Sequence, residues 1–265
     1  MALYYVAHRL FAAHDRALGA YIAHHLARRF GPDAVFLPFC DTDEENLDHP
    51  CKGRRLFELD SERLARIDAM VAILHGPSLD DGVCMEIGYA AGRGVPILSV
   101  TTDFQVYGPT ADTALRLPFP DPLLQHVVDR VISVPQLGPP GGEGDRFERF
   151  LAQNLHAITR VATEVADALT DWPTPGPAMP PPSVNDQPLA YLEPSLYGGA
   201  SWTAQVSDAL RAHGFATHHA ERFTNAAADP TLTASEDWTA LAHASLAVVD
   251  IRGPETPPGA ALVWA

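Results

Sequence analysis

Three acidic side chains follow an apolar run in the segment Ile67–Pro96. The run ends in a Gly-Pro turn, and Asp80, Asp81 and then Glu86 come after it. A run of this kind predicts a buried strand, so the acids stand just past the carboxyl end of a strand, where open α/β sheets hold their ligands. Small and apolar residues surround Glu86 in the sequence. Because a carboxylate is costly to bury there without a partner or a task, Glu86 is a candidate nucleophile.

Two further side chains belong with these acids. Tyr5 lies in the first predicted strand, and Asp60 precedes the strand that leads to Asp80. Segments that follow the first and third strands of a parallel sheet meet at one edge. Four of these groups can therefore converge on one pocket, namely Tyr5, Asp60, Asp80 and Glu86. Clustered carboxylates raise one another's pKa, so one holds a proton near neutrality while another stays ionised. Chemistry at a glycosidic carbon needs that division between nucleophile and proton donor.

Strand and helix signals alternate along the first two-thirds of the chain. We expect strands at Tyr4–Ala7, Ala34–Pro38, Met70–Leu74, Pro96–Val100 and Val131–Val134. We expect helices at His14–Phe30, at Leu59–Arg66 with Asp60 or Ser61 as the N-cap, after Asp80, and at Phe147–Leu169. An acidic stretch between Cys40 and Cys51 is predicted to be a surface loop. The alternation predicts an α/β fold in which a parallel sheet has helices on both faces.

A proline-rich stretch, Asp171–Pro182, divides the chain, since six prolines favour an extended backbone that cannot build a core. We expect a first domain over residues 1–170, a linker over 171–187 and a second domain over 188–265 that is a degenerate, truncated copy of the first. Aligning Gly76-Pro77 with Gly253-Pro254 supports the copy. The alignment pairs four more positions: Gly82 with Gly259, Asp60 with Asp237, Asp80 with Pro257, and Glu86 with Val263.

Composition excludes several classes of protein. The formal net charge is −15 and no Lys/Arg cluster occurs, which argues against a nucleic acid polymer or an anionic membrane as partner. No apolar run is long enough to cross a bilayer. The three cysteines lack metal-site spacing. We therefore expect a cytoplasmic protein with reduced thiols that uses no metal and no cofactor.

Three sequence patterns together resemble the nucleoside 2-deoxyribosyltransferase family. They are Y-x-A-x-x-x-F from Tyr5, an aspartate upstream of IDAMVAIL, and D-x-G-x-x-x-E-x-G-Y-A from Asp80. The resemblance covers about half of the chain and implies a flavodoxin-like, Rossmann-like fold. It implies that Glu86 attacks C1′ of a 2′-deoxynucleoside, that Asp80 and Asp60 handle the leaving base, and that Tyr5 steadies Glu86. The substrate-binding positions that it implies are Phe11, Arg9, Gly76, Gly82 and Asp112.

Each of these roles has a structural rival. Glu86 could pair with Arg93, and Asp80 or Asp81 could do no more than cap the helix that follows. Asp60 could be a helix cap, and Tyr5 could be a core residue.

The resemblance leaves three functions open. The first is transfer of deoxyribose between bases, with deoxynucleosides and free nucleobases as partners. The second is hydrolysis of nucleosides or nucleoside 5′-monophosphates, which Arg9 would favour. The third is a non-catalytic nucleotide sensor, suggested by the decayed second copy. Because sites of the family are usually shared between subunits, we also expect a homodimer or a larger homo-oligomer.

Overall fold

The computed structural model describes residues 2–76, 79–107, 118–134, 143–172, 187–195, 199–220, 229–251 and 263. The chain forms two compact units. The first unit comprises Met1–Gly76, Val95–Gln105 and Asp129–Gly176. The second unit comprises Pro77–Gly94, Val106–Val128 and Pro177–Ala265.

The first unit is built on a five-stranded parallel sheet with the order β2-β1-β3-β4-β5. Its strands are β1 (Tyr4–Ala7), β2 (Val35–Phe36), β3 (Ala69–Ile73), β4 (Ile97–Thr101) and β5 (Arg130–Ser133). Its helices are α1 (Ala13–Phe30), η1 (Pro32–Ala34), α2 (Pro38–Asp41), α3 (Lys52–Leu64) and α6 (Arg146–Thr170). The sequence prediction of a parallel α/β sheet is thereby confirmed. All five expected strands are present, and β2 is shorter than expected.

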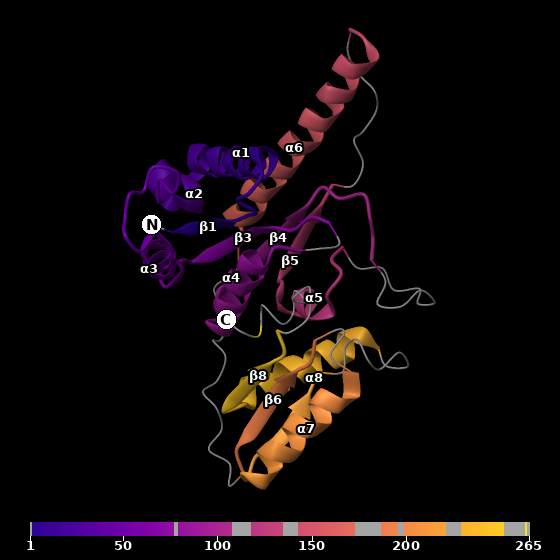
Figure 1. Ribbon diagram of the computed structural model, residues 1–265. Coiled ribbons are helices and arrows are strands. Elements are labelled where there is room, and N and C mark those ends of the chain that lie inside the picture. The colour runs from indigo at the N-terminus through magenta and orange to yellow at the C-terminus, as the bar shows by residue number, and fades with distance from the viewer. Residues whose placement is uncertain are drawn as a thin grey trace. The chain divides into compact units, whose positions relative to one another are not determined.

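One face of this sheet forms the main core. Alternate residues of β1 and β3, such as Val6 and Val71, pack with the buried sides of α1 and α6, including Leu26 and Val161. Figure 1 shows α1 and α6 side by side, and the Tyr21 hydroxyl lies 2.9 Å from the Thr159 hydroxyl between them. Burial of each such aliphatic side chain stabilises the fold by about 1.5–3 kcal/mol, so apolar packing sets the position of β1 and β3.

One sequence prediction about the first unit is wrong. Helix α3 begins at Lys52, with Cys51 as its N-cap, so Asp60 lies well inside the helix and does not cap it. The predicted acidic loop follows the short helix α2, whose last residue Asp41 accepts a hydrogen bond from the Leu37 N–H at 2.6 Å, and residues 42–51 form turns without a helix or strand, as predicted. In α3 the polar side chains of the first turn conceal a helical start that backbone hydrogen bonds build.

The second unit contains a three-stranded parallel sheet with the order β7-β6-β8. Its elements are β6 (Leu189–Glu193), β7 (Ala216–His219), β8 (Leu246–Val249), α4 (Asp81–Gly92), α5 (Pro122–Val127), α7 (Gly199–Ala212) and α8 (Pro230–His243). Helix α5 was not expected from the sequence. This strand order repeats the order β2-β1-β3 of the first unit. In the central strand β6, Tyr191 pairs in register with His218 and Ala247. In the central strand β1, Tyr5 pairs in register with Phe36 and Met70.

Several predictions fall on parts of the chain outside the described residues. These are Asp112, the linker from residue 173 to residue 186, and the second-copy positions Gly253, Pro254, Pro257 and Gly259. Val263, the position aligned with Glu86, is described and is buried. The domain boundaries and the degenerate copy therefore stay predictions. No helix of the described chain is both long and apolar enough to cross a membrane.

A close approach between α1 and the end of β1 gives a stability prediction. A Cβ at Gly19 would lie 2.4 Å from Cδ2 and 2.8 Å from Cγ of the buried His8 ring. We expect Gly19→Ala to lower the free energy of unfolding by about 1–3 kcal/mol, because a contact this short forces the buried ring or α1 to shift. Urea denaturation measures this change.

Gly53 in α3 supplies the matched control, because a Cβ there meets no atom within 4 Å. Gly53→Ala should leave the free energy of unfolding unchanged or raise it by up to about 1 kcal/mol. Equal stability of the two variants would contradict the packing of α1 on His8.

Candidate active site

Glu86 lies in the middle of α4, whose start is fixed by Asp80. The Asp80 side chain accepts a hydrogen bond from the Val83 N–H at 3.0 Å, and its carbonyl accepts one from the Cys84 N–H at 3.0 Å. The predicted helix cap at Asp80 is thus confirmed. Only Oδ1 of the carboxylate makes this cap bond, so the cap does not by itself engage Oδ2. Gly82 is exposed in the first turn, where a Cβ would lie 3.1 Å from Asp80 Oδ1.

Helix α4 carries its acids in a strongly negative environment. Burial raises the pKa of Cys84 well above its usual value, and the carboxylates of Asp121, Asp80, Asp81 and Glu86 raise it further. Burial and then the charge of Asp80 also raise the pKa of Asp81. Because burial and a neighbouring negative charge both favour the protonated form, Asp81 keeps its proton to a higher pH than an isolated aspartate does.

Asp121 belongs to this acidic group, and the sequence analysis missed it. Its side chain is fully buried and accepts a hydrogen bond from the Leu123 N–H at 2.8 Å, which caps α5. An aspartate directly before a proline is a helix-start signal, since proline suits the first helical position. The Asp121-Pro122 pair therefore could have revealed α5 and its buried cap.

Tyr5 is a core residue of the first unit, as its structural rival predicted. It is fully buried in β1, and its ring centroid lies 5.4 Å from that of Phe36. Its side chain faces the side of the sheet opposite to Tyr4 and Val6, which belong to the main core. Arg63 of α3 stacks over the Phe36 ring at 5.4 Å, so α3 covers this face.

Asp60, on the same helix α3, has an unusual environment. Its Oδ1 atom is buried and has no hydrogen-bond partner among the described residues. Burial, followed by the charge of Glu44, raises the pKa of Asp60 to about 6. Glu44 comes from the acidic segment after β2, so this segment contributes to the electrostatics of the site. A carboxyl with this pKa can give or take a proton near neutrality.

The loop after β1 presents Arg9 and Phe11 to solvent. The Phe11 side chain is 82% exposed, although phenylalanine is usually buried. The Arg16 guanidinium donates to the carbonyls of Leu10 at 2.6 Å and Phe11 at 3.1 Å, and it stacks over the Phe39 ring. The loop therefore has a fixed backbone beneath an exposed aromatic ring. Beside it lies a cavity of about 370 Å³ lined by His8, Arg16, Ala20, Leu37, Phe39, Cys40, Asp43 and Glu45.

The turn after β3 is held to the end of β4. Gly76 has φ +80°, a conformation that other residues adopt only with strain, and its N–H donates to Asp103 at 3.0 Å. Next to it, His75 Nε2 lies 2.9 Å from the Thr102 hydroxyl. His75 and Asp103 were not singled out in the sequence, because no local pattern shows that the two loops meet.

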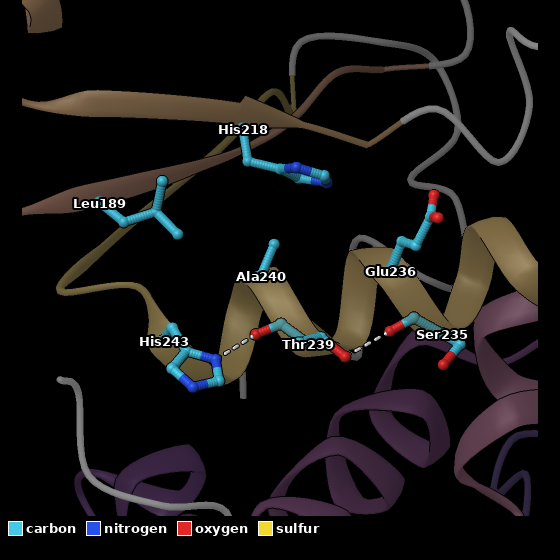
Figure 2. A pocket seen from close by; sticks show the side chains of 7 residues that line it. All are labelled: Leu189, His218, Ser235, Glu236, Thr239, Ala240 and His243. Atoms are coloured by element: carbon cyan, nitrogen blue, oxygen red, sulfur yellow. Dashed lines mark hydrogen bonds between the residues drawn. The ribbon is translucent and has the colours of Figure 1, made fainter.

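A second pocket, of about 510 Å³, lies in the second unit and contains none of the predicted site residues. Figure 2 shows it between β-strand residues and one side of α8. Its lining residues are Leu189, His218, Ser235, Glu236, Thr239, Ala240 and His243. His218 Nε2 lies 3.0 Å from the carboxylate of the buried Asp237. The described part of the chain holds no cluster of three His, Cys, Asp or Glu side chains suited to a metal ion.

Comparison with known proteins identifies the family. The family model described as nucleoside 2-deoxyribosyltransferase matches residues 4–152, more than half of the chain. The chain belongs to the nucleoside 2-deoxyribosyltransferase family. The matched residues contain Tyr5, Asp60, Asp80 and Glu86, as the sequence resemblance predicted.

Two solved structures are similar to this family member. A conserved protein from Enterococcus faecalis V583 is 26% identical, with a TM-score of 0.38, over 50% of this chain and 91% of that chain. The 2-deoxyribosyltransferase from the psychrotolerant bacterium Bacillus psychrosaccharolyticus is 21% identical, with a TM-score of 0.31, over 43% of this chain and 77% of that chain. A search of curated proteins returned no match.

The raised pKa of Asp60 predicts a pH-dependent stability of this deoxyribosyltransferase-family protein. A carboxyl with a folded-state pKa of about 6 and an unfolded value near 3.8 destabilises the fold above pH 6 and no longer does so below pH 4. We expect Asp60→Asn to be more stable than the wild type at pH 8, by roughly 1–3 kcal/mol after allowance for solvent screening, and the difference to vanish by pH 4. Denaturant unfolding across this pH range measures it.

Glu44→Gln is the matched variant, because it removes the neighbouring charge and keeps Asp60. It should stabilise the protein at pH 8 in the same direction but by less, since burial is the larger cause of the pKa shift. A pH-independent difference between Asp60→Asn and the wild type would contradict the assignment.

Proposed function

We propose that this protein transfers the 2-deoxyribosyl group of a 2′-deoxynucleoside from one nucleobase to another, through a covalent intermediate on Glu86. The observation that carries the proposal is membership of the nucleoside 2-deoxyribosyltransferase family over residues 4–152. The acidic environment of α4 and the raised pKa of Asp60 support it, because the reaction needs both an ionised and a protonated carboxyl.

The reaction is a double displacement. A carboxylate oxygen of Glu86 attacks C1′ of the sugar while the C1′–N bond to the base breaks, and Asp60 or Asp80 gives its proton to the departing base. The incoming base then attacks C1′, the bond to Glu86 breaks, and the proton of the incoming base returns to the aspartate. Two inversions at C1′ give net retention of configuration.

Asp60 is the better-suited proton donor of the two. Its pKa of about 6 leaves a usable fraction protonated near neutrality, and its unpartnered Oδ1 can bond to a base nitrogen. One oxygen of Asp80 is committed to the helix cap, so Asp80 serves chiefly as a hydrogen-bonding group for the base. Tyr5 would steady Glu86, and Arg9, Phe11, Gly76, Gly82 and Asp112 would line the substrate site. A shared site in a homodimer or larger assembly is expected as well.

Base exchange tests the function directly. Incubation of deoxyinosine with free adenine or cytosine should give deoxyadenosine or deoxycytidine and free hypoxanthine, measured by chromatography. Release of free base and free deoxyribose without any new nucleoside would instead show a hydrolase. Binding of nucleosides without turnover of any of them would show a sensor.

Glu86→Gln should reduce the rate of base exchange by at least about 10⁴-fold, since the amide cannot form the ester intermediate. A slowly released 2-fluoro deoxynucleoside analogue should add its sugar mass to the wild-type protein and leave the mass of Glu86→Gln unchanged. Labelling of both proteins at another residue would overturn the assignment of the nucleophile.

Asp80 caps helix α4 and, in the proposed function, also binds the base of the substrate. Two substitutions separate these two roles. Asp80→Ala should lower the free energy of unfolding by about 1 kcal/mol, while Asp80→Ser keeps a capping oxygen and most of that stability. Both should lower kcat by about 10²–10⁴-fold if the carboxyl acts on the base. Wild-type kcat in Asp80→Ser would leave Asp80 with the cap alone.

A further inference from the structure

His75 stands at the carboxyl edge of the five-stranded sheet, just after the end of β3. Its ring reaches across to the end of the neighbouring strand β4, where Nε2 accepts a hydrogen bond from the Thr102 backbone N–H at 2.8 Å. The Thr102 hydroxyl lies 2.9 Å from the same nitrogen. The histidine is half-buried, so part of the ring remains open to solvent.

The Thr102 contact fixes the proton on the ring. A backbone N–H can only donate, so Nε2 must be the unprotonated acceptor and a neutral ring must carry its proton on Nδ1. Nδ1 has no hydrogen-bond partner among the described residues, and it is not among the fully buried unpartnered atoms of that part of the chain. His75 therefore offers a fixed N–H donor that points to no protein group described in the structure.

The charges around His75 leave this neutral form in place. Burial lowers the pKa of His75, the charges of Asp103 and Asp15 oppose that change, and the charge of Arg9 adds to it. The net effect is a lowered pKa, so the ring is neutral at pH 7. Protonation of Nε2 would also break the Thr102 bond, which acts in the same direction.

The exposed ring of Phe11 lies in the loop that follows the adjacent strand β1, at the same edge of the sheet. Strands β1 and β3 pair in parallel, with Ala7 beside Ala72, so the loop that carries Phe11 and the turn that carries His75 follow neighbouring strand ends. The exposed Phe11 ring is suited to stack on a nucleobase. A base held there exposes ring nitrogens and carbonyl oxygens along its edge, and these need a donor.

We propose that His75 is a substrate-binding residue whose Nδ1–H donates a hydrogen bond to a ring nitrogen or carbonyl oxygen of the bound base. This inference rests on the proposed function, since it assumes that a nucleoside binds at this edge. The Thr102 bond holds the donor in one orientation before the substrate arrives, so little rotational freedom is lost on binding.

Two substitutions separate the effect of losing the Nδ1–H donor from the effect of losing the hydrogen bond to Thr102. In His75→Gln the side-chain carbonyl can take the place of Nε2 and keep the Thr102 N–H bonded, while the donor at Nδ1 is lost. In His75→Asn the amide N–H₂ lies close to the former Nδ1, while the acceptor for Thr102 is lost. We expect His75→Gln to raise the KM for deoxyinosine about tenfold with little change in kcat or thermal stability. His75→Asn should raise KM by no more than about threefold and lower the melting temperature.

The rank order of the two variants decides the inference. A larger rise of KM in His75→Asn than in His75→Gln would make His75 a structural tie between β3 and β4, and an unchanged KM in His75→Gln would remove it from the site. If the wild type fails to exchange bases, the proposed function falls. Calorimetric Kd values for deoxyinosine then test His75 by the same rank order, and a wild type that binds no deoxyinosine overturns the inference too.

Discussion

The parallel pairing of β1, β3 and β4 is the constraint on which the first unit depends. Hydrogen bonds of 2.9 Å from the Met70 N–H to the Pro96 carbonyl and from the Leu74 N–H to the Val100 carbonyl tie β3 to β4 along its length. Parallel strands end at the same edge, so the loop after β1, the turn after β3 and the start of the loop after β4 are brought together there. The bonds of His75 and Gly76 to the Thr102–Asp103 pair extend this pairing past the strands and give the edge a defined shape.

The acids of this protein lie where packing alone would not place them. Asp60 keeps a buried oxygen without a partner in the described chain, and Asp121 is fully buried near the Cys84 thiol and the α4 acids. The environment of Asp60 opposes folding above the raised pKa of this carboxyl, because a buried negative charge is unfavourable. The apolar core beneath α1 and α6 offsets this cost. A carboxyl that is costly to ionise is also one that delivers its proton near neutral pH, so the instability and the proposed chemistry have the same origin.

The parts of the structure that were predictable from sequence are those governed by local patterns. The run at Met70–Ile73 is continuously apolar and the run at Ile97–Val100 is apolar apart from the buried Ser99, as strands buried on both faces require. The boundary of α3 was not predictable, because its N-cap Cys51 makes no side-chain cap bond and the first turns are polar and charged. The role of His75 was equally hidden, since its partner Thr102 lies on another strand and only the fold brings them together. The family itself was predictable, because the motif from Asp80 spans strand, turn and helix at once and lies within the matched residues 4–152.

The second unit has the same order of three strands but a different set of polar contacts. Tyr191 lies in β6 as Tyr5 lies in β1, and its ring stacks on His218 where Tyr5 contacts Phe36. The sequence alignment predicts that Asp237 holds the place of Asp60, and Asp237 is buried against His218 at 3.0 Å. The Asp237 carboxylate thus has a hydrogen-bond partner in His218, whereas Oδ1 of Asp60 has none among the described residues. A histidine therefore stands in β7 at the register position that Phe36 holds in β2, and it gives the buried aspartate of the second unit a hydrogen-bond partner.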